Sequence, residues 1–432
     1  MKRILVIFFC TVCLTGFSQQ RLSLTDAINI ALKNSYDIQL AKNFLEISSI
    51  NNHIGVAGGL PVVNATANNN EQLTTINQKF SDASRNTTRN NVGSNNLTTG
   101  VTGSIILFNG YRVVATKKRL DELQQQNQQL LNAQIQNTIA VVMTKYYDVV
   151  RQQTYSKTIF QSIDVSKKRL DILNIRKEVG LSNNADIFQA QIDLNGLLQS
   201  QQSQDLVVEQ AKTDLLGLIY LKPDAPIIIT DTIVIDKTMN LDSIRNYLRN
   251  NPQLLAANQQ IRINELIEKE TAALRYPTVR ATTGYNFTSS KSAAGFSLLN
   301  QSYGAFVSLN LAIPIYNGGV NKRLQQVAGI NTRNAIIQRD NLSLDFDIAA
   351  VRAYQSYINT IRQLQTSQEN YALSTQLLDL VLQRFQLGQA TIIDVKLAQQ
   401  SFENEGYRLV NLNYAAKVAE IELKRLANQL AL

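Results

Sequence analysis

The sequence contains no tryptophan, one histidine, two cysteines and six prolines in 432 residues. It also lacks the phosphate loops, metal-ligand clusters and nucleophile elbows that mark many enzymes, and its only histidine, His53, lies at a polar helix end. We therefore expect no enzymatic activity, no cofactor and no metal site. Lysine and arginine exceed aspartate and glutamate by 42 to 33, but no basic cluster is interleaved with aromatic residues, so we expect no nucleic-acid partner.

Residues 1–18 have the pattern of a secretory signal peptide. Basic residues precede an apolar stretch at 4–14, and a small-x-small cleavage sequence follows at 16–18. The apolar stretch is too short to span a membrane, and no later segment is apolar enough for a transmembrane helix. Both cysteines, Cys10 and Cys13, lie within the apolar stretch at 4–14. The exported chain would therefore have no disulfide, and its stability would depend on packing or assembly.

The remainder of the chain is a duplication. We assign residues 19–222 to a first repeat, 223–240 to a connector and 241–432 to a second repeat. The equal halves favour one architecture built twice over two unrelated domains. The residues that recur at a fixed spacing of 208 positions are Phe108 and Tyr316, Gly180 and Gly388, and Asp186 and Asp394.

Helical periodicity dominates both repeats. At about 1.5 Å per residue, each of the two longest predicted helices would be on the order of 100 Å long. Their apolar residues, such as Phe346, Ala350 and Tyr357, mostly recur every three or four positions, and this narrow seam predicts coiled-coil packing. The expected helices are 22–34, 36–56, 112–179 and 184–219 in the first repeat, and 241–251, 252–275, 320–387 and 391–430 in the second.

Each repeat also contains a predicted strand hairpin, at about 61–108 and 277–314. Apolar and polar residues alternate there, and polar loops are expected at 71–96 and 289–302. An ordinary surface hairpin is the commoner explanation. However, strands of about ten residues with a small, polar far face fit a transmembrane β-barrel, whose lumen is polar. A further short strand is expected at 227–235 in the connector.

A sharp turn is expected at the end of each long helix. Gly180 and Gly388 have the place of a C-cap glycine, which can adopt the left-handed conformation that ends a helix. A new helix begins a few residues later, with Asp186 or Asp394 in its first turn, where a carboxylate complements the helix dipole.

With these features in register, the chain resembles the TolC-like outer-membrane efflux family. The shared motifs are L-T-D-A-I-N-I-A-L-K-N near the start, the F-N-G and Y-N-G-G turns, and the sequences V-G-L-S-N-N-A-D-I-F-Q-A-Q and L-G-Q-A-T-I-I-D-V-K-L-A-Q at the helical turns. The resemblance covers essentially the whole mature chain. It implies a mostly helical fold that forms a homotrimer, with a twelve-stranded β-barrel in the outer membrane and a periplasmic α-helical barrel.

The resemblance also implies a function and partners. The trimer would be the channel of a tripartite efflux or secretion system, a passive exit duct surrounded by outer-membrane lipid. It would open when a periplasmic adaptor and an inner-membrane RND or ABC pump dock at its tips. Carried over by motif, the residues of the adaptor-docking tips are Gly180, Ser182, Asp186, Gly388, Thr391 and Asp394.

The same resemblance makes Asp394 and Asp186 candidates for the gate that closes the tunnel. The best-known family members carry a second acidic residue one turn after the position of Asp394, where this chain has Leu397. This departure leaves two interpretations of Asp394. It is either a gate residue or only a partner of the helix dipole.

A different class of protein also fits part of the pattern, namely an exported structural coiled coil whose hairpins are simply tips. Such a protein would need no barrel and would stay soluble, so fractionation with and without detergent separates it from a channel. A simple diffusion porin does not fit, because helix dominates and too few strands are present. The sequence does not indicate whether the cargo is a drug, a metal, a protein or a polysaccharide.

Overall fold

The computed structural model describes residues 20–293 and 298–430. The described residues belong to two compact units, and the signal peptide expected at 1–18 lies outside them. Each unit takes residues from both sequence repeats, so the repeats and the compact units do not coincide. Among the described residues, the first unit comprises 20–42, 131–252 and 342–430, and the second comprises 43–130, 253–293 and 298–341.

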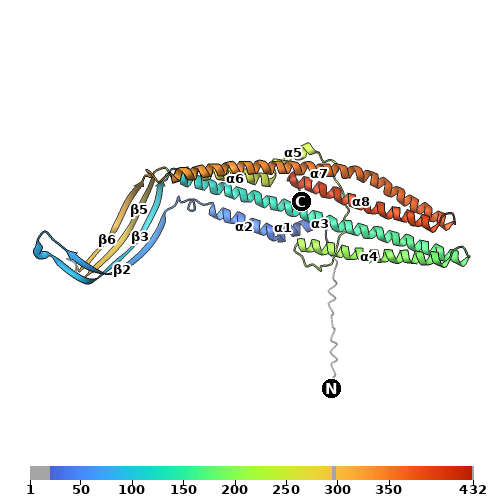
Figure 1. The fold of residues 1–432 in the computed structure, drawn as a ribbon, viewed down its shortest axis with the longest axis horizontal. Helices are drawn as coiled ribbons and strands as arrows, with labels where there is room; N and C mark the ends of the chain where they lie inside the picture. Colours follow the sequence, from blue (N-terminus) through green and yellow to red (C-terminus); the bar gives the residue numbers. More distant parts are fainter. Residues whose placement is uncertain (1–19, 294–297, 431–432) are drawn as a thin grey trace, which may run out of the picture. The chain divides into compact units, whose positions relative to one another are not determined.

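Helices make up most of the described chain (Figure 1). Both of the longest helices have residues in each unit. Within the described ranges, no helix combines the length and the apolar composition that crossing a membrane requires. The helices are α1 (Leu24–Asn34), α2 (Tyr36–Asn51), α3 (Arg112–Glu178), α4 (Asn184–Leu218), α5 (Leu241–Leu248), α6 (Pro252–Ala273), α7 (Val320–Gln386) and α8 (Ile392–Leu426).

Most of these helices end within a few residues of the positions that the sequence predicts, but α2 is clearly shorter. We expected it to continue to residue 56, and it ends at Asn51. Immediately afterwards the backbone N–H of Gly55 donates to Nδ1 of His53 at 3.1 Å, and Gly58 adopts a φ of 82°. This tight turn replaces the last turn of the expected helix, and the left-handed conformation of Gly58 ends it.

The second unit contains an antiparallel four-stranded sheet in the order β2-β3-β5-β6. Its strands are β2 (Val62–Gln78), β3 (Thr87–Phe108), β5 (Thr278–Ser292) and β6 (Leu299–Ala312). β2 and β3 form a hairpin from the first repeat, and β5 and β6 form a hairpin from the second. Pairing of β3 with β5 joins the two hairpins into one sheet. β2 and β6 are its edges.

The strands continue well into the segments 71–96 and 289–302, which we predicted as polar loops. The pairing of β2 with β3 continues as far as Gln78 and Thr87. Asparagine side chains bond across these strands, since Asn95 Nδ2 donates to Asn69 Oδ1 at 2.8 Å and to Glu71 Oε1 at 3.1 Å. The prediction was wrong because polar composition favours loops, whereas here polar residues pair with one another across a sheet.

The register gives the sheet one apolar and one polar face. Tyr303, Val307 and Leu311 of β6 lie opposite Phe287, Thr283 and Val279 of β5 on one face. The apolar residues of β6 are freely exposed, Val307 to 85%. The opposite face of β6 carries Ser302, Gly304, Ser308 and Asn310, with Phe306 as its large apolar exception, because a strand turns successive side chains to opposite sides. The alternation predicted from the sequence is therefore confirmed.

The core of the first unit surrounds the middle of α3. Tyr146 is fully buried there, and its hydroxyl donates to the Asp231 carboxylate at 2.6 Å. The connector strand predicted at 227–235 is reduced to β4 (Ile227–Ile228), which pairs in parallel with β1 (Gln20–Arg21).

Beyond β4 the connector is held by side chains of α8 instead of by a strand partner. Lys417 Nζ donates to the Val234 carbonyl at 2.8 Å, and the backbone N–H of Asp236 donates to Glu420 Oε2 at 3.0 Å. After Arg21 the chain passes into the N-cap of α1 at Ser23, so no strand continues alongside the rest of the connector.

The seam predicted along the second long helix is confirmed in α7. Tyr357, Leu364, Leu378 and Phe385 are all buried. They are spaced by seven residues or a multiple of seven, which is the period of a coiled coil.

Candidate functional site

The two long helices both end in a turn of the same construction, and both turns belong to the first unit. Gly180 and Gly388 have φ values of 74° and 76°. In the first turn the N–H of Leu181 donates to the Arg176 carbonyl at 2.7 Å, and in the second the N–H of Gln389 donates to the Arg384 carbonyl at 2.8 Å. This is the 6→1 bond of a glycine-terminated helix, so these two predicted residues do turn the chain.

Each turn leads directly into a capped helix. Asn183 caps α4, and its side chain accepts from the N–H of Asp186 at 2.9 Å. Thr391 caps α8 in a reciprocal arrangement with Asp394, since Asp394 N donates to Thr391 Oγ1 at 3.2 Å and Thr391 N donates to Asp394 Oδ2 at 2.8 Å. Such a capping box satisfies backbone donors that a helix start leaves unpaired.

The cap also defines the charge of Asp394. Hydrogen bonds from the backbone and hydroxyl of Thr391 hold the pKa of this exposed carboxyl below its ordinary value. Asp394 is therefore an anion at neutral pH, and its carboxylate already has a structural task at the start of α8. The neighbouring Leu397 presents an apolar side chain that is 57% exposed.

The predicted residues of the first turn are less engaged. No side-chain hydrogen bond of Asp186 occurs within the described residues, although its backbone N–H is capped. Ser182 Oγ is buried without a hydrogen-bond partner among the same residues. No bond there joins Asp186 to Asp394, so the two candidate gate residues are not brought into contact within the chain.

A small apolar core lies behind the two turns and joins them. Leu173 from α3, Ala190 from α4, Phe385 from α7 and Val395 from α8 are all buried together. Arg176 lies over the ring of Phe385, with its guanidinium carbon 5.3 Å from the ring centroid. The four helix ends are thus packed against one another by apolar contact.

An ion-pair cluster lies next to this core and was not predicted from the sequence. Arg169 is only 1% exposed, and its Nη2 lies 2.9 Å from Asp193 Oδ2. Lys396 Nζ lies 3.1 Å from the other oxygen of Asp193. Because these residues belong to α3, α4 and α8, the cluster ties the first helical pair to the second.

Electrostatics stabilise the anionic form of Asp193. Burial by itself would raise the pKa of this carboxyl, but hydrogen bonds from Lys396 and Gln189, together with the charge of Arg169, outweigh burial and lower it. The carboxyl of Asp193 is therefore an anion at neutral pH.

A second unpredicted tie lies on the side of Asp193 away from the turns. The side chain of Gln399 is buried, and its Nε2 donates to the Ser162 carbonyl at 3.3 Å and to Ser166 Oγ at 3.2 Å. Its counterpart in the first repeat, Gln191, is exposed, and within the described part of the chain its side chain bonds only to Asn195 of its own helix, at 3.1 Å. The repeated Ala-Gln motif thus has different surroundings in its two copies.

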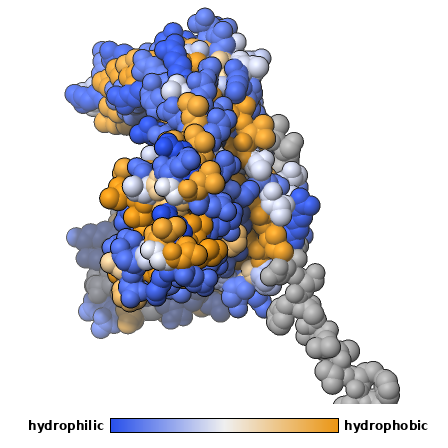
Figure 2. All heavy atoms as spheres, turned by 90° about the vertical axis from the view of Figure 1, so that its right-hand side faces the viewer, coloured by the Kyte–Doolittle hydropathy of each residue, from blue (hydrophilic) through white to orange (hydrophobic). Residues whose placement is uncertain are grey.

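Large apolar side chains remain exposed around both turns. Figure 2 views the side of the molecule on which the turns lie in Figure 1, and shows orange patches among polar residues. Apolar residues exposed to this degree near one another commonly mark a binding surface. Those at the turns are Val179 (67%), Leu181 (68%), Leu387 (72%) and Ile393 (65%).

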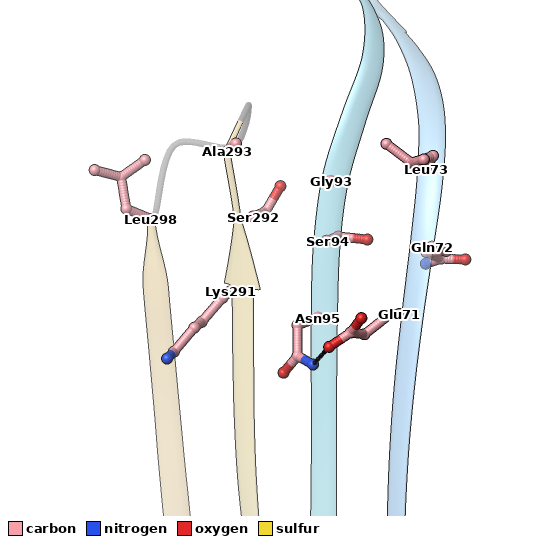
Figure 3. A pocket seen from close by; sticks show the side chains of 10 residues that line it. All are labelled: Glu71, Gln72, Leu73, Gly93, Ser94, Asn95, Lys291, Ser292, Ala293 and Leu298. Atoms are coloured by element: carbon pink, nitrogen blue, oxygen red, sulfur yellow. Dashed lines mark hydrogen bonds between the residues drawn. The ribbon is translucent and has the colours of Figure 1, made fainter.

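The second unit has a cavity of its own at the end of the sheet where β5 ends and β6 begins, shown in Figure 3. Its volume is about 600 Å³, and Glu71, Asn95 and Lys291 point into the same side of the sheet there. The hydrogen bond between Glu71 and Asn95 closes one flank. Its lining combines charged and amide side chains with the apolar Leu73, Ala293 and Leu298.

Comparison with known proteins gives a consistent result. A family model described as "Outer membrane efflux protein" matches residues 27–219 and 243–429. The chain is 23% identical to Protein CyaE of Bordetella pertussis over 244 residues, which is 56% of this chain and half the length of that protein. It is 24% identical to Outer membrane protein TolC of Vibrio cholerae over 317 residues, 68% of each chain.

The fold is also that of a solved structure. The outer membrane protein VceC of Vibrio cholerae superposes with a TM-score of 0.77 at 17% sequence identity, and the match covers 94% of this chain and 96% of that one. At such low identity the likeness establishes the fold.

Proposed function

The chain belongs to the outer membrane efflux protein family, and from this premise we propose that it forms the channel of a tripartite efflux or secretion system. Three copies would enclose a passive duct through the periplasm and the outer membrane. A periplasmic adaptor and an inner-membrane RND or ABC pump would complete the system and open the duct.

The sheet of the second unit is the observation that carries this proposal. Its apolar face is exposed, and in the described residues its edge strands β2 and β6 each pair on one side only. Unpaired strand edges are not tolerated in lipid, so a membrane-embedded sheet must be closed by further strands. Pairing β6 of one copy with β2 of the next would close it, with the polar face lining the lumen.

The helical turns support the docking part of the proposal. Val179, Leu181 and Leu387 expose apolar surface beside Gly180, Ser182, Gly388 and Thr391, as a protein partner would require. Asp186 and Asp394 would contribute to the gate as part of the trimer. For Asp394 this role would come in addition to its capping of α8.

Photo-crosslinking in cells tests docking directly. A photoreactive benzoylphenylalanine at Leu387 or Leu181 should capture a periplasmic protein, to be identified by mass spectrometry as an adaptor. The matched control is Val234 in the connector, which is 71% exposed and should capture no adaptor. Equal capture from all three positions, or none from the turns, would remove the turns from the docking surface.

The channel itself is tested separately. The protein purified from membranes should give ion conductance in a planar bilayer, and it should be released from membranes only by detergent. Release without detergent would favour the alternative of a soluble structural coiled coil.

A further inference from the structure

The second unit contains a pocket between the start of α3 and the end of α6, close to where the sheet begins. Its volume is about 300 Å³. Ala115 and Ala273 are buried in its floor, and Val114 and Leu266 add further apolar surface. No aspartate or glutamate is among its lining residues.

Two lysines from different helices line this pocket. Lys118 comes from α3 and Lys269 from α6, and both are exposed. Neither makes an ion pair with any residue that the structure describes. Their neighbours do, because Lys117 pairs with Asp121 at 2.5 Å and Arg119 with Glu270 at 2.7 Å. Glu265 and Glu268, which lie on the same helix as Lys269, do not line the pocket, so its lining carries two positive charges and no negative one.

The turn at Gly110 places two tyrosines at the pocket's sheet end. A Cβ on Gly110 would lie 2.8 Å from Tyr276 Cβ, so only glycine permits this close approach. Tyr111 follows with a φ of 63° and a side chain that is 73% exposed. The equivalent position in the second repeat is Gly319, with a φ of 74°.

The contrast between Tyr111 and Gly319 suggests that the tyrosine side chain has a use. The left-handed conformation is strained for a bulky residue and free of strain for glycine. The ring makes an edge-on contact with Phe108, with 5.6 Å between the ring centroids, but it is otherwise exposed, so burial offsets only part of this strain. Strained residues are concentrated at binding sites.

We propose that this pocket binds the phosphate headgroup of an anionic phospholipid at the helix-side edge of the outer membrane. Lys118 and Lys269 contact the phosphate, and Tyr111 and Tyr276 occupy the interfacial layer where aromatic side chains gather. The apolar floor accepts the start of an acyl chain, which continues along the apolar face of the sheet. The inference rests on the proposed function, since it requires the sheet to lie in a membrane.

Native mass spectrometry of the purified full-length mature protein in mild detergent tests the site. Phosphatidylglycerol and phosphatidylcholine of identical acyl chains are added in equal amounts. We expect bound phosphatidylglycerol to exceed phosphatidylcholine, and the double variant Lys118→Gln/Lys269→Gln to reduce the apparent affinity for phosphatidylglycerol by on the order of tenfold. Lys291→Gln, which removes an exposed lysine at the opposite end of β5, is the matched control and should change nothing.

Tyr111→Asn separates binding from folding. Asparagine tolerates the left-handed conformation, so the variant should unfold at an unchanged or higher temperature while it loses phosphatidylglycerol. Equal binding of both lipids, unchanged binding by the double lysine variant, or displacement of the lipid by sodium phosphate at equimolar concentration would each overturn the proposal. Conductance of the same variants is measured in parallel, so a protein that conducts without lipid preference refutes this site and leaves the channel standing.

Discussion

Single glycines decide where the long helices turn, and their effect can be separated from packing. An added Cβ at Gly388 would meet only the end of the Arg176 side chain, 4.0 Å away, so a substitution there acts through φ and not through steric overlap. For a β-branched residue the left-handed conformation costs about 2 kcal/mol.

We predict that Gly388→Val abolishes export of cargo while oligomer formation and membrane insertion persist. Export and heat-resistant oligomer are measured on the same cells. The matched control is Gly196→Val in α4, a helical glycine with open space around it, where the substitution should be neutral or slightly stabilising. Normal export by the Gly388 variant would show that the turn plays no part in the mechanism.

Asp193 is the residue whose removal should most weaken the tie between the helical pairs. Asp193→Asn leaves the guanidinium of Arg169 buried without its counter-charge, and we expect unfolding to become easier by about 2–3 kcal/mol. Urea denaturation of the purified protein measures this change. Asp164→Asn is the control, because its pair with Lys168 is more than half exposed and should contribute less than about 0.5 kcal/mol.

The same pair of variants gives a pH prediction. Because folding lowers the pKa of Asp193, its contribution to stability is present above the ordinary carboxyl pKa of about 4 and is lost as pH falls through the lowered value. The stability difference between the wild type and Asp193→Asn should therefore shrink when denaturation is repeated in increasingly acidic buffer. A constant difference across this range would show that the charge of Asp193 is not what stabilises the site.

Some residues of the helical turns could be predicted from the sequence and others could not. Gly180 and Gly388 follow from a local rule, since a glycine after a long periodic segment ends a helix. Asn183 could have been found in the same way, as an N-cap residue three positions before Asp186. Arg169, Asp193 and Lys396 could not, because their contact depends on the packing of helices that are distant in sequence.

At the scale of elements, the two faces of the sheet make opposite predictions for one substitution. Val307→Arg adds a charge to the apolar face of β6, where burial in lipid would cost about 2–4 kcal/mol. We expect loss of the heat-resistant oligomer from the membrane fraction. Ser308→Arg, one residue along on the polar face, should leave the oligomer intact. Equal tolerance of both changes would argue against a lipid-facing surface.

The elements also show where composition misleads. Helices were predictable because a period of three to four residues persists over long segments of α3 and α7. The outer parts of the strands were not, since Asn, Ser and Thr are read locally as loop residues, whereas the cross-strand bonds of Asn95 make them part of the sheet. The connector strand was overestimated for a related reason: its apolar alternation is real, but β1 is too short to pair with it.

At the scale of the molecule, closure of the sheet by neighbouring copies can be trapped chemically. Both native cysteines, at 10 and 13, lie in the predicted signal peptide, so its removal would leave a cysteine-free background. Ala65→Cys on β2, combined with Ala305→Cys, Val307→Cys or Leu309→Cys on β6, should yield disulfide-linked oligomers for at least one pair under mild oxidation. Non-reducing electrophoresis detects them. Once the non-covalent oligomer has been fully dissociated, the single variants should run as monomers, and failure of every pair would contradict closure through these edges.

The two unpaired edges have a genetic consequence as well. A copy whose β6 cannot pair would still offer a sound β2, so it could enter an assembly and leave the ring open at its other side. Expression of such a copy beside the normal one should therefore inactivate the mixed assemblies, and the defect should be dominant. A copy that lacks the whole sheet could not enter at all, and its defect should be recessive.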